Sequence, residues 1–210
     1  MPSIAKKVIF ITFLTSLFLN ANSSYILKQE YLKPQAAEMI NTIGQELTLK
    51  TGVNAYVLET NESFPIGYNL VQYSERYHQK MKVPYILYLF APNALITEKT
   101  KQRGRIGIIP SSNTLKALYD YDAVRDAGLD VITVKDKNSI IDKYNIGVLQ
   151  AYSELADQIA AHKNVKMEHT IPNETQLFVN VIRVILYTGL ILIVWIFFIK
   201  PMIQKRGKND

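Results

Sequence analysis

The chain has 210 residues, no cysteine and a formal net charge of +6 at pH 7. A chain without cysteine has no disulfide, no thiolate nucleophile and no cysteine-ligated metal centre. Residues 25–175 carry 17 Lys and Arg against 17 Asp and Glu, so the positive excess lies in the two terminal segments. A neutral central segment argues against a phosphate backbone as a ligand, and we expect no nucleic-acid partner.

Residues 1–21 are predicted to be a signal peptide. Lys6 and Lys7 precede a 12-residue apolar run over 8–19, which is too short to span a bilayer and typical of a signal-peptide core. Ala21 supplies a small residue for cleavage, whereas Leu19 fits the −3 position poorly. Cleavage and retention as an N-terminal anchor both stay open, and both place residues 25–175 outside.

The elements of residues 25–162 follow from apolar spacing and from helix-ending or turn residues. The pattern predicts helices over residues 32–50, 68–81, 114–125 and 139–162, and strands over residues 53–59, 84–91 and 104–110. The continuous apolar run at 84–91 is typical of a central strand buried on both faces. Two segments stay open: residues 92–103 as a hairpin arm or a loop, and residues 128–134 as a strand or a link.

This order of elements predicts an α/β fold, a small mixed sheet sandwiched by helices, with one transmembrane helix after it. We expect the extracytoplasmic domain to cover residues 25–162, and residues 163–176 to form a polar juxtamembrane linker.

Residues 177–199 are predicted to be that transmembrane helix. They contain one charged residue, Arg183, and 23 helical residues reach about 34 Å, enough for a hydrocarbon core of about 30 Å. A buried core helix is the alternative, but globular helices keep a polar face and this run is apolar all round.

The basic tail over residues 200–210 indicates the cytoplasmic side of the membrane. The sequence therefore predicts a single-pass protein of the bacterial inner membrane with its domain outside. Arg183 lies near the outer end, where it either extends to the lipid headgroups or contacts a partner helix or lipid. The residues expected to contact the bilayer are Arg183, Trp195, Lys200, Lys205 and Arg206.

Two stretches resemble the TPM domain family. Residues 32–60 begin with Leu32 and a predicted helix, continue with Thr51 and Gly52, and then carry Val57 within a predicted strand and Thr60 directly after it, each at a place that matches the family. Residues 142–160 resemble the closing helix of the family, with Tyr144, Gly147 and Val148 in the matching places. The family also combines a signal peptide, an extracytoplasmic domain and a C-terminal membrane helix, and the resemblance covers roughly residues 31–162.

An acidic cluster after the third predicted strand is the candidate metal site. Asp122 and Asp126 are spaced to share a helix face, and Asp120 lies just before them. Carboxylate oxygens are the ligands that Ca²⁺ and Mg²⁺ prefer, so these three residues are the candidate ligands for either ion. No catalytic constellation with the spacing of a hydrolase or a nucleotide-binding loop accompanies them.

These observations favour a non-catalytic role. The chain is expected to be a membrane-anchored binding or assembly factor for another membrane or envelope complex. The alternative, which rests on the TPM resemblance, is a weak metal-assisted phosphatase with Asp120, Asp122 and Asp126 as metal ligands.

Overall fold

The computed structural model describes residues 24–172 and 174–200, with the side chains of 174–183 and 198–199 excepted. The predicted signal peptide and the basic residues Lys205 and Arg206 lie outside the described residues. The described chain divides into two compact units, with the boundary between Ile171 and Pro172.

The first unit is an α/β domain built on one mixed sheet. Its strands are β1 (Ile26–Lys28), β2 (Asn54–Glu59), β3 (Tyr85–Leu95) and β4 (Arg103–Pro110), which lie side by side in the order β1-β2-β3-β4. β1, β2 and β3 are parallel, whereas β4 runs antiparallel to β3, with Ile86 opposite Pro110 and Leu95 opposite Arg103. The predicted α/β class and small mixed sheet are therefore confirmed.

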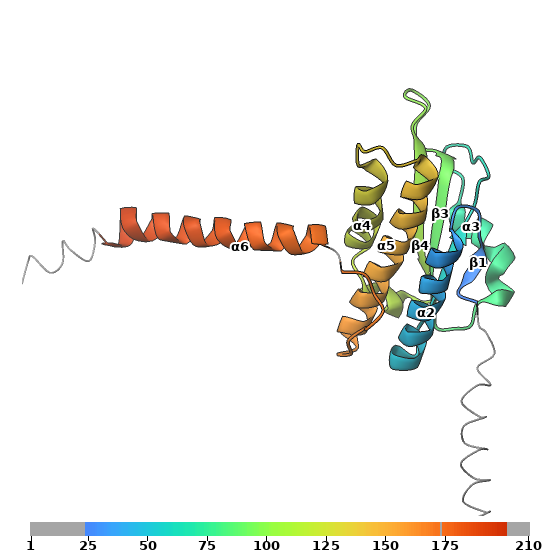
Figure 1. The fold of residues 1–210 in the computed structure, drawn as a ribbon, viewed down its shortest axis with the longest axis horizontal. Helices are drawn as coiled ribbons and strands as arrows, with labels where there is room; N and C mark the ends of the chain where they lie inside the picture. The colour runs from blue at the N-terminus through green and yellow to red at the C-terminus, as the bar shows by residue number, and fades with distance from the viewer. Residues whose placement is uncertain (1–23, 173, 201–210) are drawn as a thin grey trace, which may run out of the picture. The chain divides into compact units, whose positions relative to one another are not determined.

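Three helices form one layer on the sheet: α2 (Pro34–Thr51), α4 (Tyr121–Thr133) and α5 (Ile140–His162). Figure 1 shows α5 between α2 and α4, and the short α3 (Leu70–Ser74) on the other side of the sheet. A 3₁₀ helix, η1 (Glu75–Lys80), continues α3, so the helix predicted over 68–81 is present only in part. This layering explains why every residue of β2 is buried.

The ends of the long helices follow local chemistry. Pro34 occupies the first turn of α2, where its missing N–H costs nothing. Gly52 ends the helix in the left-handed region, at φ 73°, and donates its N–H to Thr48 O at 2.9 Å. Ser139 begins α5, because its side chain accepts the N–H of Asp142 at 3.1 Å.

Between β4 and α5 the prediction was wrong. Residues 113–118 form a 3₁₀ helix, η2 (Asn113–Leu118), and the α-helix begins only after Asp120. α4 then runs through 128–134 as far as Thr133, so this segment is neither the strand nor the extended link considered for it. Gly128 lies in its middle because the backbone of α5 approaches closely: a Cβ there would meet Gly147 O at 2.9 Å.

The segment 92–103 is a hairpin arm, the first of its two alternatives. β3 extends through it to Leu95, and the N–H of Ile96 donates to Gln102 O at 2.8 Å. β1 was not predicted at all. It is three residues long and too short for an alternating pattern to be recognised.

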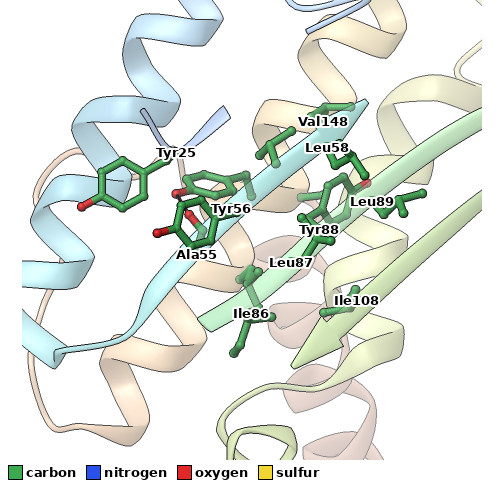
Figure 2. Packing of buried hydrophobic residues seen from close by; sticks show 14 of the residues in the cluster. Tyr25, Ala55, Tyr56, Leu58, Ile86, Leu87, Tyr88, Leu89, Ile108 and Val148 are labelled. Carbon is green, nitrogen blue, oxygen red and sulfur yellow. Dashed lines mark hydrogen bonds between the residues drawn. The ribbon is translucent and has the colours of Figure 1, made fainter. Parts of the chain in front are cut away.

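The core lies against both faces of the sheet, since its cluster includes side chains of the α2–α5–α4 layer as well as Leu70 and Tyr73 of α3. Figure 2 shows buried side chains of β2 and β3, among them Leu58 and Tyr88, together with Val148 of α5. Tyr152 of α5 is fully buried and donates its hydroxyl to Ala55 O of β2 at 2.8 Å. This bond ties the longest helix of the domain to an inner strand.

The second unit contains α6 (Glu174–Val194), which continues as a π-helix, η3 (Trp195–Ile199). All its described large apolar side chains from Val184 to Phe197 are at least 41% exposed. No helix among the described residues is long and apolar enough to cross a membrane.

Candidate functional site

The three aspartates of the predicted metal site lie at the start of α4, and each has a protein partner. Asp120 is the residue that caps the helix: its Oδ1 accepts the N–H of Asp122 at 2.9 Å and of Ala123 at 3.2 Å. This arrangement satisfies two of the N–H groups that the first turn of a helix leaves without a partner.

Asp122 and Asp126 flank one cation rather than an open site. Arg125 Nη1 lies 2.7 Å from Asp122 Oδ1, and Arg125 Nη2 lies 2.8 Å from Asp126 Oδ1. Both carboxylates are well exposed, and their ion pairs raise the pKa of Arg125. Within the described residues, no three or more His, Asp or Glu side chains are grouped so that they could hold one metal ion.

A second polar cluster lies at the carboxyl ends of β1 and β2. Lys28 ends β1, and its Nζ lies 3.0 Å from Glu30 Oε1 and 3.5 Å from Glu62 Oε1. Tyr73 of α3 donates its hydroxyl to Glu62 Oε1 at 2.6 Å, and its hydroxyl oxygen lies 3.0 Å from the hydroxyl oxygen of Thr60. The carboxyl ends of parallel strands are where open α/β sheets usually bind ligands, which makes this cluster the first place to look for a site.

The charged and polar groups of this cluster are hydrogen-bonded to one another, and these bonds shift their pKa values. Burial opposes the charge on Lys28, but the hydrogen bond with Glu30 raises its pKa to about 12. Burial and the hydrogen bond to Glu62 raise the pKa of Tyr73 to about 12, while that bond lowers the pKa of Glu62. At neutral pH the lysine is therefore charged, the tyrosine neutral and the carboxylate ionised. The network links β1 to α3, and neither Lys28 nor Tyr73 is in a form that accepts a proton at that pH.

Glu59 lies next to this network and is fully buried at the end of β2. Its Oε2 accepts three successive backbone N–H groups, those of Glu30, Tyr31 and Leu32, at 2.8–3.0 Å. Burial raises the pKa of the carboxyl group, although these three bonds favour its ionised form. Its Oε1 has no hydrogen-bond partner among the described residues, and neither has the buried hydroxyl of Tyr88.

Sequence reasoning missed this cluster because it missed β1. Lys28 and Glu30 sit at the end of a strand that has only three residues. One signal was present: an apolar strand that ends on an acidic residue, Glu59, followed by Thr60 and Glu62. A charge that closes a buried strand is expensive unless it is hydrogen-bonded, so it indicates a specific set of partners.

The predicted membrane residues are described only in part. Arg183 lies within α6, Trp195 opens η3 with half of its surface exposed, and Lys200 is exposed after it. The apolar side chains near Trp195 are exposed as well, so this end of the helix presents no polar face of its own.

No family model matches the chain, and no curated protein matches it either.

Proposed function

We propose that this chain is a single-pass membrane protein of the bacterial inner membrane. Its α/β domain lies outside and acts as a binding or assembly factor for a membrane or envelope complex, and its C-terminal tail lies in the cytoplasm.

One observation carries the anchor. From Val184 to Phe197 the helix exposes large apolar side chains, at 41–69% of their surface, with no charged residue among them. Apolar surface of this extent marks a membrane or protein contact. A bilayer covers all sides of a helix at once, and Lys200, Lys205 and Arg206 then follow on the cytoplasmic side.

The TPM-like class is part of the proposal, and local features support it. The Thr51–Gly52 pair ends α2 directly before β2, as the resemblance implies. Tyr144 and Gly147 lie on α5, and Gly147 is at the close approach of α5 to α4. A packing role for this glycine agrees with a motif that defines a fold rather than a reaction.

A binding role is favoured over the phosphatase. Metal ions at Asp120, Asp122 and Asp126 would have to displace a helix cap and two ion pairs with Arg125. In the polar cluster around Lys28 and Tyr73, the raised pKa values keep the lysine charged and the tyrosine neutral, so neither of them serves as a general base at neutral pH. Neither cluster therefore supplies the open water position and the free ligands that metal-assisted hydrolysis needs.

The test has two parts. The full chain should stay in the membrane pellet at alkaline pH, and external protease should reach the α/β domain in spheroplasts. Replacing Leu190 with Arg should release the chain from the membrane pellet. The same replacement at Leu49, which is 74% exposed on α2, should leave the chain in the pellet. A wild-type chain that alkali extracts would refute the anchor.

Crosslinking in intact membranes tests the binding role. It should recover the same partner protein reproducibly, and failure to do so would refute the assembly role. The same experiment with Arg183→Leu separates two roles of this residue. Unchanged recovery means that Arg183 only reaches the headgroups, and lost recovery means that it contacts the partner.

A further inference from the structure

β4 forms one edge of the sheet. β3 pairs with one side of it, and no strand among the described residues pairs with the other. The opposite edge, β1, has only three residues, so β4 is the longer exposed edge. An exposed strand edge is a template for pairing with another chain unless it is blocked.

The hydrogen bonds to β3 determine which groups of β4 point outward. Ser111, directly after β4, donates its N–H to Tyr85 O at 2.8 Å. In an antiparallel pair the bonded positions alternate, so 105, 107 and 109 bond to β3, while Ile106, Ile108 and Pro110 direct their backbone groups away from it. The hydroxyl of Tyr121 agrees with this assignment, since it donates to Ile106 O from outside at 3.0 Å.

Four backbone groups of this edge have no partner among the described residues. They are the N–H of Ile106, the N–H and C=O of Ile108, and the C=O of Pro110. Pro110 has no N–H to offer, and Ile106 O is already occupied by Tyr121. The edge thus has two donors and two acceptors at regular spacing.

We propose that this edge binds a second copy of the chain, with the two β4 strands antiparallel and Ile108 opposite Ile108 of the other copy. In this register the two Ile108 residues exchange both of their bonds, and each Ile106 N–H meets the Pro110 C=O of the other copy. All four open groups are satisfied. At each end of this ladder Pro110 of one copy lies opposite Ile106 O of the other; proline has no N–H to donate, so the ladder ends there, and the Tyr121 side chain has to move aside from Ile106 O to admit the proline ring.

Such a contact is isologous, because the same patch serves on both copies, and it closes as a dimer. It also brings no like charges into opposition, since Arg105 faces Ser111 of the other copy in this register. Any other register leaves at least one of the four groups unpaired or places Pro110 against an open acceptor. A self-complementary edge therefore favours a second copy over an unrelated strand.

The surroundings of the edge leave room for a strand. An open hollow of about 490 Å³ is lined by Arg105–Ile109 of β4, by residues 67–71 and by Tyr121. Val71 and Tyr121 at its rim are 47% and 41% exposed, so apolar surface is available to cover the added strand. Ile108, which also lines the hollow, is 8% exposed.

Disulfide trapping tests the register, and the chain contains no cysteine that would interfere. In the proposed pairing Gly107 faces Ile109 of the other copy at a non-bonded position, where the Cα atoms lie about 4.5 Å apart, within disulfide range. A Cβ at Gly107 makes only ordinary contacts, the nearest at 3.7 Å. Full-length Gly107→Cys and Ile109→Cys chains with different tags are co-expressed and oxidised in the membrane.

The expected result is a disulfide-linked product that carries both tags, and far less product when either variant is expressed alone. Combining Ile106→Pro with the cysteine variants removes one of the two outward N–H groups and should reduce the yield at least several-fold. Ile106→Val keeps the N–H and should not. Pairing of the anchors alone cannot produce this pattern.

The proposal is overturned if co-expressed, folded chains give no mixed product, or if Ile106→Pro forms it as efficiently as Ile106→Val. Crosslinking of either cysteine to a different protein would assign the β4 edge to another partner, and this result would also overturn the proposed pairing. If Ile106→Pro fails to fold, by circular dichroism and thermal unfolding, the trapping of the parent pair decides alone.

Discussion

Glu59 Oε2 lies 2.8 Å from the backbone N of Tyr31, and the same oxygen accepts the N–H groups of both neighbours of Tyr31. Three successive N–H groups at the start of the connection from β1 to α2 are therefore held by one carboxylate from β2. The side chain is fully buried, so this contact determines how the connection leaves the sheet.

This burial makes the domain sensitive to pH through Glu59. Its pKa is raised in the folded state by burial, so the folded chain binds the proton more tightly than the unfolded chain does. The corresponding stabilisation is complete below about pH 4.5, the unfolded value, and is lost as pH rises through the folded pKa. Glu59→Gln, which resembles the protonated acid, should therefore unfold at a temperature equal to or above that of the wild type at neutral pH.

The matched control is Glu59→Ala, which removes the acceptor and leaves three buried N–H groups without a partner. It should cost about 3 kcal/mol or more, and at every pH. Thermal unfolding of the full chain in detergent between about pH 5 and about pH 7.5 measures both effects. A Glu59→Gln variant that loses stability as pH rises, in parallel with the wild type, would contradict the prediction.

Glu46 has the opposite pH dependence. Burial opposes its ionisation, but hydrogen bonds from Lys50, His169 and the backbone of Glu168 and His169 lower its pKa to about 2. Its contribution is present above about pH 4.5 and is lost as pH falls through the folded value. A shift of this size corresponds to about 3 kcal/mol.

Glu46→Gln should therefore destabilise the domain by up to about 3 kcal/mol near neutral pH, with the loss disappearing in acid. It should also free the segment around His169 from α2, which faster hydrogen exchange at Glu168 and His169 would report. Glu38→Gln, on the exposed surface of the same helix, serves as the control and should leave both quantities unchanged. Equal stability of the two variants at neutral pH would refute the role of Glu46.

Two backbones meet at Gly147. A Cβ at this position would lie 2.9 Å from Gly128 O and 2.7 Å from Ile132 Cγ1, closer than packed atoms allow. Gly147→Ala should thus cost about 1–3 kcal/mol through overpacking between α4 and α5, although alanine is the better helix former. Gly189→Ala is the helical control, since nothing lies within 4 Å of its Cβ, and denaturant unfolding that ranks the two variants equally would contradict this contact.

The same pair of glycines shows where prediction from sequence stops. Apolar spacing was sufficient for α2, α5 and the three longer strands, because each has a long periodic or continuous pattern. For α4 the sequence does not determine the start of the helix, because Ser112, Asn113 and Asp120 are all suitable caps, and a glycine such as Gly128 is unfavourable within a helix. Only the approach of α5, which is not local in sequence, explains a glycine within that helix.

For the two polar clusters, as for the helices, one part could be predicted from the sequence and another could not. The acidic cluster was visible as a run of aspartates, but their pairing with Arg125 depends on rotamers that spacing does not determine. The cluster around Glu59 joins residues from β1, β2 and α3, which lie up to 45 positions apart from Lys28 to Tyr73. Such a set becomes visible only when the strand order is known.

Two buried tyrosines provide a matched pair. The hydroxyl of Tyr88 has no partner among the described residues, whereas that of Tyr152 donates to Ala55 O at 2.8 Å. Tyr88→Phe removes an unpaired polar atom and should be neutral or stabilising by up to about 1 kcal/mol, while Tyr152→Phe should cost about 1 kcal/mol. Unfolding free energies from denaturant titration should differ in that direction, and a larger loss for Tyr88→Phe would reveal a partner for its hydroxyl.

Metal binding by the aspartates at the start of α4 distinguishes the binding role from the metal-assisted phosphatase. Because Asp120 caps the helix and Arg125 pairs with Asp122 and Asp126, we expect calorimetry of the full chain to give no binding heat with Ca²⁺ or Mg²⁺. Arg125→Ala removes the competing cation and leaves two carboxylates one helical turn apart, so this variant should bind divalent ions weakly. If the wild type instead binds either ion and its melting temperature rises, and if Asp122→Asn with Asp126→Asn abolishes both effects, the carboxylates are metal ligands. The metal-assisted phosphatase then becomes the better account of this domain.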